Sequence, residues 1–398
     1  MKKFTDKLVE GLFKMSGAVT SIMVLLIIVF LFKEGIGLFN ASTVEKGYTL
    51  FVNSNNPIEK LSPESLKKVF DGEVENWKAL GGKDESIRVF RFDEIFSLYS
   101  DEELGTDYAL LPQKLGEIIQ SDATIIAYVP QKYKPKSTDG IKELEHIKIS
   151  LNDFFLGREW LPTATPAPLF GIVPLVLGTL LVSLIAILIA IPLGVGVAIY
   201  LAKIASENVR KFLKPAIELL AGIPSVVYGF FGLVVLAPIV QKAGALSMGE
   251  TAFTGSLILA IMALPTIISI AEDAMRNTPK AMQDASLALG ATKWQTIHKV
   301  IIPYASSGIA AAVVLGVGRA IGETMAVLMV TGNAAVIPHS MFESVRTIPA
   351  TIAAELGEAP AGGTHYQSLF LLGCVLFVIT LIISIIAEVI SSRKIFKE

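Results

Sequence analysis

Long apolar segments dominate this chain of 398 residues and decide what it can fold into. A helix that crosses a membrane needs about 20 consecutive apolar residues, because each residue advances a helix by about 1.5 Å. Hydrophobic residues make up 52% of the sequence and its mean hydropathy is +0.60, which also indicates a membrane protein with several spans. We expect six spans, at 16–33, 169–201, 216–240, 251–271, 303–331 and 367–390.

Lysine and arginine are unevenly distributed over the segments between these spans. The short loops that would face outward carry only Lys242 and Arg346. The segments that would face inward carry Lys2, Lys3, Lys7, Lys14, Lys203, Arg210, Lys211, Lys214, Arg276, Lys280, Lys293, Lys299, Arg393, Lys394 and Lys397. Because cations in short loops resist translocation, we expect a multi-pass protein of the cell (inner) membrane with both termini in the cytoplasm. The first span lacks a cleavage motif after Phe32, so we interpret it as a retained anchor.

Several classes of function are disfavoured by composition. The net charge is −2 and no basic stretch is interleaved with aromatic residues, so no nucleic-acid partner is expected. Cys374 is the single cysteine, and the histidines at 146, 298, 339 and 365 lack ligand spacing, so neither a disulfide nor a metal site is expected. No phosphate-binding G-x-x-x-x-G-K-[ST] motif is present, and no cofactor is predicted.

Residues 34–165 interrupt the membrane pattern with a mostly polar segment, which the loop charges place outside the cell. Alternating and helical periods are mixed in it, and this predicts a small α/β domain. We expect strands at 48–52, 87–90 and 123–129 and helices at 63–70 and 112–120. The Pro-rich stretch LPTATPAP at 161–168 is typical of a semi-rigid linker back to the membrane.

A polar stretch at 278–303 separates the fourth and fifth spans. Thr278 can cap a helix that starts at Pro279, and Met282, Ala285 and Leu289 fall on one face of it. Gly290 suits the left-handed backbone that ends such a helix. Thr292 and Gln295 form the pattern of a capping box, which opens a second helix.

This stretch resembles the cytoplasmic coupling loop of ABC-importer permeases, which has the pattern E-A-A, three residues, G, nine residues, a hydrophobe, one residue and L-P. The matching residues here are Asp284, Ala285, Ser286, Gly290, Val300, Ile302 and Pro303. The resemblance implies that residues 272–302 contact a separate cytoplasmic ATPase. The alternative is an ordinary amphipathic connector between two spans.

Three further strings resemble the PstC-type permeases of phosphate-specific ABC importers. They are ELLAGIPSVVYGFFGL at 218–233, GVGRAIGETMAVLMVTGN at 316–333 and TIPATIAAELGEA at 347–359. The resemblance covers about 169–392 and implies an all-α membrane protein with six transmembrane helices of the type I (MetI-like) permease fold, with the α/β insert between the first two. It implies that the chain itself is no enzyme. It also implies phosphate as substrate, and as partners a sister permease of the PstA type, two copies of an ATPase and an extracytoplasmic phosphate-binding protein.

Arg319 lies in the middle of the fifth expected span, where a cation costs about 2.5–3.5 kcal/mol and therefore usually faces a cavity or a partner. Glu323 follows at i+4 and can neutralise it. We expect Arg319, Glu323 and Thr324 to line the substrate pathway, with a closed structural ion pair of Arg319 and Glu323 as the alternative. For Gly318 and Gly322 we favour helix packing at a subunit interface.

Glu218 is expected to pair with Arg210 or Lys214 near the cytoplasmic end of the third span. For Ser225, Tyr228 and Thr324 we expect hydroxyl back-bonding or packing rather than contacts to an oxyanion.

Residues 61–92 within the insert are similar to a segment of periplasmic phosphate-binding proteins. The matching residues are Phe70, Gly72, Asn76, Trp77, Gly81 and Gly82. Those proteins hold the anion with a Ser-Gly-Thr loop after the next strand, and here the chain continues DEIFSLYSDEELGTD. We therefore expect a docking or packing role for the insert rather than a second ligand site.

The expected organisation has four parts: 1–33 with the first span, the insert 34–165, the permease domain 166–392 with its coupling loop 272–302, and a cytoplasmic tail 393–398. Three other functions stay open. The chain could carry sulfate, molybdate or tungstate, or it could sense phosphate or dock a partner. It could also be an ion-coupled secondary transporter, although the inverted repeats typical of that class are not found.

Overall fold

A computed structural model describes residues 2–45, 47–135, 139–144 and 148–392. The expected tail 393–398 lies outside the described residues. The chain divides into two compact units, a helical one of residues 1–35 and 173–398 and a smaller one of residues 36–172.

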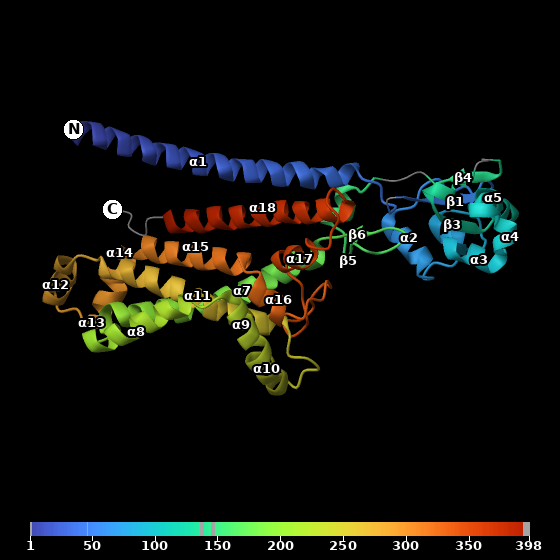
Figure 1. Cartoon of the computed structure of the whole chain (residues 1–398). Coiled ribbons are helices and arrows are strands. Elements are labelled where there is room, and N and C mark those ends of the chain that lie inside the picture. The colour runs from blue at the N-terminus through green and yellow to red at the C-terminus, as the bar shows by residue number, and fades with distance from the viewer. Residues whose placement is uncertain (1, 46, 136–138, 145–147, 393–398) are drawn as a thin grey trace. The chain divides into compact units, whose positions relative to one another are not determined.

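The helical unit is made of helices, most of them joined by short turns, with a longer loop at 331–347 between α16 and α17 (Figure 1). Its α-helices are α1 (Lys2–Ile36), α7 (Val173–Ile199), α8 (Glu207–Ala221), α9 (Ser225–Phe231), α10 (Ala237–Gly244), α11 (Ala252–Arg276), α12 (Lys280–Ala288), α13 (Lys293–Thr296), α14 (Ile302–Tyr304), α15 (Ser306–Gly322), α16 (Met325–Val330), α17 (Ile348–Glu355) and α18 (Thr364–Ser392). Wider π-turns at Tyr200–Ile204, Gly232–Leu236 and Ile297–Ile301 extend or join some of them.

Five of the described helical segments are long and apolar enough to cross a membrane, and a bent pair gives a sixth. The five are Glu10–Asn40, Val173–Ile204, Ser225–Gly244, Ala252–Arg276 and Thr364–Ile386. The bent pair is Lys293–Tyr304 with Ser306–Gly322, and the angle between its halves is 70°. The six expected spans are thus recovered when the bent pair is taken as one span, but the third and fifth are not the continuous helices that the apolar runs suggested.

Small residues bring α7, α11 and α15 close together. A Cβ added to Gly316 of α15 would lie 2.7 Å from Ile267 of α11, and one added to Gly194 of α7 would lie 2.8 Å from the same side chain. Ile267 therefore fills the space that two glycines leave open. The helix α11 is the most buried of the described spans, with 61% of its apolar window inside the protein.

The first helix meets the last near one end, where α1 finishes and α18 begins (Figure 1). Phe30 of α1 meets Phe370 of α18 edge to face, with ring centroids 5.4 Å apart. A Cβ on Gly35 would come within 2.9 Å of Leu371 Cα, so only glycine permits this approach. Apart from such contacts the membrane part of α1 is exposed, so α1 lies at the periphery of the helical unit.

The smaller unit is an α/β domain built on a four-stranded sheet of order β2-β3-β1-β4. Strand β1 (Tyr48–Asn53) runs antiparallel to β3 (Ile125–Pro130) and β4 (Ile141–Glu143), and β2 (Arg88–Arg91) runs parallel to β3. The helices of this unit are α2 (Pro63–Phe70), α3 (Ile95–Leu98), α4 (Asp101–Leu104), α5 (Leu111–Ser121) and α6 (Leu151–Phe155). The three strands and two helices expected for the insert are confirmed, while β4, α3, α4 and α6 are additional.

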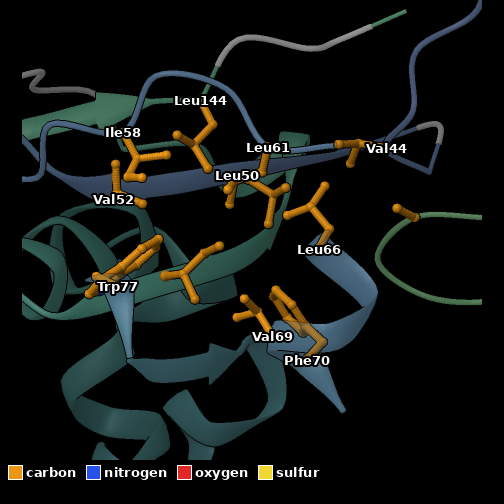
Figure 2. Packing of buried hydrophobic residues seen from close by; sticks show 12 residues of the cluster. Val44, Leu50, Val52, Ile58, Leu61, Leu66, Val69, Phe70, Trp77 and Leu144 are labelled. Atoms are coloured by element: carbon orange, nitrogen blue, oxygen red, sulfur yellow. The ribbon is translucent and has the colours of Figure 1, made fainter. Parts of the chain in front are cut away.

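Side chains alternate between the two faces of this sheet, so that each face has its own core. Leu50 and Val52 of β1 join the cluster under α2, whereas Phe51 points to the opposite cluster with α5. Figure 2 shows the first cluster, in which Leu66, Val69 and Phe70 of α2 and Trp77 cover the strand. Trp77 is 1% exposed and its indole Nε1 donates a hydrogen bond to Thr124 O at 2.8 Å.

The residues that resemble a phosphate-binding protein form turns in this unit. Gly72 and Gly81 have φ of 76° and 86°, a backbone that favours glycine. The side chain of Asn76 accepts a hydrogen bond from Lys78 N and caps the turn that follows. These residues therefore shape the backbone around Trp77.

The Pro-rich stretch 161–168 is not a free linker. Strand β5 (Trp160–Leu161) pairs antiparallel with β6 (Leu169–Phe170), so the stretch is the loop of a hairpin. Gly157 and Gly171 cross so closely that a Cβ on either would lie within 2.6 Å of the other's backbone. The small unit therefore continues to Ile172, beyond the expected boundary at 165.

Candidate functional site

The fifth span is broken at the residues that were expected to line the substrate pathway. Helix α15 ends at Gly322, Glu323 is extended at φ −69° and ψ 132°, and α16 begins at Met325. The Glu323 carboxylate accepts a hydrogen bond from Ala326 N at 3.3 Å and so satisfies a free amide at the start of α16. The expected continuous helix to residue 331 is therefore wrong in this region.

Because of this break, Arg319 and Glu323 do not form the ion pair expected from their i+4 spacing. Among the described residues no carboxylate lies within 4.0 Å of the Arg319 guanidinium. Arg319 is half-buried. The Arg319 guanidinium thus lies in the membrane part of the protein, and its N–H donors are not paired with a carboxylate of the described residues.

Glu323 lines a narrow gap between α7, α11 and the break, too small to admit a water molecule. The hydroxyl groups of Thr179, Ser183 and Thr347 also line it. Thr179 donates to Leu175 O at 2.7 Å and accepts from Ile348 N at 2.9 Å, which joins α7 to α17. The gap is completed by apolar side chains, among them Val182, Leu259 and Val327, so it is a mixed contact inside the helical unit.

Thr324 lines a different hollow, an open depression of about 510 Å³ between the break, α17 and α18. The other lining residues are apolar or glycine: Gly322, Pro349, Ile352, Ala353, Leu356, Gly357 and Leu376. Its hydroxyl donates to Gly322 O at 3.2 Å, as expected for back-bonding. The structure thus places Arg319, Glu323 and Thr324 in three separate surroundings around one break.

Neither Gly318 nor Gly322 is packed against another helix of the described chain. A Cβ added to either residue would meet nothing within 4 Å. The close helix contact in this span is made by Gly316 and by Gly308, whose Cβ would lie 2.3 Å from Ala274 Cβ. The face with Gly318 and Gly322 is therefore open for a further subunit, in line with the expectation, which stays a prediction.

The segment between α11 and α15 forms the expected helix-glycine-helix. Gly290 has φ of 85° and ends α12, and Thr292 and Gln295 form the expected capping box at α13. Ser286 and Thr296 share a hydrogen bond of 3.0 Å between their hydroxyl oxygens, which holds the two helices together. Asp284 and Ala285 are exposed on α12, and Pro303 lies in α14 just before the 70° bend.

One detail of this segment was predicted wrongly. Pro279, not Thr278, is the residue before α12, and the Thr278 hydroxyl is buried without a hydrogen-bond partner in the described structure. The backbone carbonyl of Thr278 is used instead, since it accepts a hydrogen bond from Gln283 Nε2 at 2.9 Å. The Gln283 side chain therefore ties α12 back to the end of α11.

A buried carboxylate that sequence reasoning missed lies at the end of α11. The side chain of Glu272 is 1% exposed, and Arg210 Nε lies 2.8 Å from its Oε1 and Lys214 Nζ 3.2 Å from its Oε2. The pairing of these cations with Glu218 was therefore predicted wrongly; Glu218 is exposed. Glu272 stands between the buried residues Ile268, Ala271 and Met275 of one helix face, and this spacing is the signal that could have revealed it.

Lys214 also lies 3.1 Å from Asp273 Oδ1. Burial by itself lowers the pKa of Lys214, but the carboxylates of Asp273 and Glu272 outweigh this effect and hold its pKa above the ordinary value. Lys214 is therefore a charged partner of the buried carboxylate.

The fold and the helix-glycine-helix define a class of protein, the membrane-embedded subunits of transporters that work with a separate binding protein. Residues 190–396 match the family described as binding-protein-dependent transport system inner membrane component, and the chain belongs to this family. Residues 31–93 match the PBP superfamily domain.

Individual relatives narrow the class. The chain is 41% identical over 259 residues to the phosphate transport system permease protein PstC of Mesorhizobium japonicum, which covers 60% of this chain and 78% of that protein. It is 40% identical over 258 residues to the probable ABC transporter permease protein YqgH of Bacillus subtilis, and the matched region covers 64% of this chain and 83% of that protein. Among solved structures, the inward-facing MetNI methionine ABC transporter is similar at 20% identity and a TM-score of 0.43, covering 57% of this chain and 95% of that one.

Proposed function

We propose that this chain is the permease subunit of an ATP-driven phosphate importer and forms half of its translocation pathway. The relatives named as phosphate transport permeases support phosphate as the substrate. The single structural observation that carries the proposal is the half-buried Arg319, which has no carboxylate partner among the described residues and stands at the end of a broken span. Such a cation is costly in a membrane unless it serves an anion or a partner.

Arg319 would bind the oxyanion through its planar fork of N–H donors, which matches two phosphate oxygens at once. Glu323, in the narrow gap, and Thr324, in the open depression, flank the same break and are proposed to line the pathway with it. The helix ends at Gly322 and Glu323 is extended, so the two halves of the span can tilt separately in this proposal. Alternate exposure of Arg319 to the two sides of the membrane would move the anion.

The energy source is proposed to be a separate ATPase, present in two copies, that contacts α12. Apolar side chains around α12 are exposed, with Met282 at 41%, Leu289 at 90% and Trp294 at 60%. Exposed apolar groups of this size on a polar segment mark a protein interface. A sister permease of the PstA type is proposed to pack on the open face of Gly318 and Gly322.

The loop charges support a placement in the cell membrane with both termini, the coupling loop 272–302 and the ATPase on the cytoplasmic side. The insert would then lie outside, where an extracytoplasmic phosphate-binding protein delivers the substrate. The match of residues 31–93 to the PBP superfamily domain favours a docking role for the insert, or a phosphate-sensing role as the second candidate.

Uptake of radioactive phosphate by proteoliposomes tests the proposal. The complex of this permease, its sister permease and its ATPase is reconstituted and supplied with the binding protein. We expect uptake that needs both ATP and the binding protein and that resists a ten-fold excess of sulfate, molybdate or tungstate. If one of these anions competes strongly, that anion rather than phosphate is the substrate, and the protein is still an ATP-driven importer. Uptake without ATP would instead indicate a secondary transporter.

A further inference from the structure

The buried carboxylate of Glu272 fastens α8 to α11. Arg210 and Lys214, one helical turn apart on α8, lie within 3.2 Å of its two oxygens, and Arg276 Nη1 lies 3.8 Å away. Below them, Leu213 and Ile217 of α8 pack against the cluster that contains Ile268, Ala271 and Met275 of α11. Since removing one partner of a buried ion pair leaves an uncompensated charge, Glu272 fixes where α8 lies on α11.

The segment that follows Glu272 leads straight into α12. Asn277 N bonds to Asp273 O at 3.1 Å, so the end of α11 stays ordered up to the turn. Gln283 of α12 then donates to Thr278 O at 2.9 Å and accepts from Lys203 Nζ at 3.4 Å. These bonds connect α12 to the end of α11, where Glu272 lies.

On the other side, α8 is connected to the broken span by a hydrogen bond. The chain turns at Gly222, Ile223 and Pro224, and the Tyr228 hydroxyl of α9 donates back to Leu220 O of α8 at 2.8 Å. This bond closes the turn and links α9 to the end of α8.

The helix α9 in turn reaches the region of Arg319. A Cβ added to Gly229 would lie 2.7 Å from Met329 Sδ and 3.0 Å from Ala326 Cα, so α9 packs tightly on α16, just after the break in the fifth span. The path from α12 therefore ends at the residues that flank the pathway.

We propose that the ion pairs of Glu272 with Arg210 and Lys214, here called the joint, transmit a movement of α12 to α8. The hydrogen bond from Tyr228 to Leu220 O then passes this movement through α9 to the break beside Arg319. Glu272 and Tyr228 are positioning residues. The transport part of this inference rests on the proposed function, because it assigns the movement to a motor that acts on α12. The mechanical part concerns this chain alone.

Hydrogen exchange of the full chain in detergent tests the mechanical part without any substrate. Glu272→Gln keeps the volume of the side chain but removes its charge, and Glu218→Gln is the matched control, an exposed carboxylate on α8. We expect exchange of amides in both α8 and α9 to accelerate at least about ten-fold in E272Q, with α18 and E218Q unchanged. Tyr228→Phe should accelerate α9 alone. Faster exchange confined to α11, or no change, overturns the joint.

The ratio of phosphate transported to ATP hydrolysed, measured in proteoliposomes, tests the transport part. We expect E272Q and Y228F each to lower this ratio about ten-fold while ATP hydrolysis continues, and the double variant to be no worse than E272Q, because both interrupt one path. Lys214→Met, which leaves Arg210 on Glu272, should give an intermediate ratio and serves where E272Q fails to assemble. If uptake and ATP hydrolysis both fall in proportion to the amount of assembled complex, then Glu272 and Tyr228 have a merely structural role.

The two measurements separate the two proposals. A wild-type complex that hydrolyses ATP without moving phosphate contradicts the proposed function, and hydrogen exchange still decides whether the joint exists. A wild type that transports phosphate, together with variants that keep its ratio, contradicts the joint alone.

Discussion

Replacing Arg319 separates a pathway residue from a structural one. In the described structure its guanidinium is half-buried and has no carboxylate within 4.0 Å, so its removal leaves no buried anion unpaired. We therefore expect Arg319→Lys and Arg319→Ala to change the melting temperature of the assembled complex only slightly. A closed structural pair would instead cost about 3–5 kcal/mol on removal of one partner.

The effect on transport should be much larger than the effect on stability. A hydrogen bond to a charged group contributes about 1.5–3 kcal/mol, and lysine keeps the charge but loses the second arm of the fork. At about 1.36 kcal/mol per factor of ten, Arg319→Lys should slow initial phosphate uptake about 10- to 150-fold. Arg319→Ala, which also loses the charge, should slow it further.

Initial rates of radioactive phosphate uptake, normalised to the amount of assembled complex, give the measurement. Glu323→Gln is the companion variant, because Arg319 and Glu323 could form an ion pair only in the working transporter. In that case Glu323→Gln would slow uptake as much as Arg319→Lys does, and the double variant would be no slower than either single variant. Normal uptake by both Arg319 variants in intact complexes would refute the pathway role.

Three further outcomes are expected. Position 290 has a left-handed backbone, so Gly290→Leu should cost about 1–2 kcal/mol and weaken both ATPase co-purification and phosphate uptake. Asparagine tolerates this backbone, so Gly290→Asn should behave almost like wild type. Equal co-purification of the ATPase with the two variants would contradict a coupling role. Trp77→Phe should destabilise the insert by about 1–3 kcal/mol, since Thr124 O loses its donor, and faster hydrogen exchange of β3 in the full chain measures it. Burial raises the pKa of Asp122, but the hydrogen bonds it accepts from Thr124 and Arg88 outweigh this effect and hold its pKa below the ordinary value. Asp122 therefore stabilises the insert above about pH 4, and this stabilisation is lost as the pH falls through the lowered pKa. The insert of Asp122→Asn should be less stable than wild type at neutral pH and equally stable in acid; a difference in unfolding free energy that stays constant over this range would contradict the assignment.

The sequence predicted those parts of the fold whose signals are local. The apolar runs located the spans, and the Ser62–Pro63 start of α2 and the glycine with its capping box at 290–295 located helix ends within a residue or two. In each case one residue type satisfies a backbone requirement at its own position. Such requirements can be read without knowledge of the tertiary structure.

The candidate site was predicted less completely, because its geometry depends on contacts between distant segments. An apolar run continues across Gly322 to Val330 and gives no sign that Glu323 leaves the helix to cap α16. The partners of Arg210 and Lys214 could not be chosen from sequence proximity, since Glu272 is 62 residues from Arg210 in the chain. The β5 and β6 pairing that turned an expected linker into a hairpin is equally non-local.

The contact between α1 and α18 has a consequence for how the protein is made. Phe30 and Gly35 can meet Phe370 and Leu371 only after the insert and the spans between them have been synthesised. Until then the first helix waits in the bilayer as an unpartnered anchor while the insert and the other spans are produced. A bulky residue at Gly35 should therefore leave insertion and early folding intact and show its damage only at the final step, as a full-length chain whose first and last helices fail to meet.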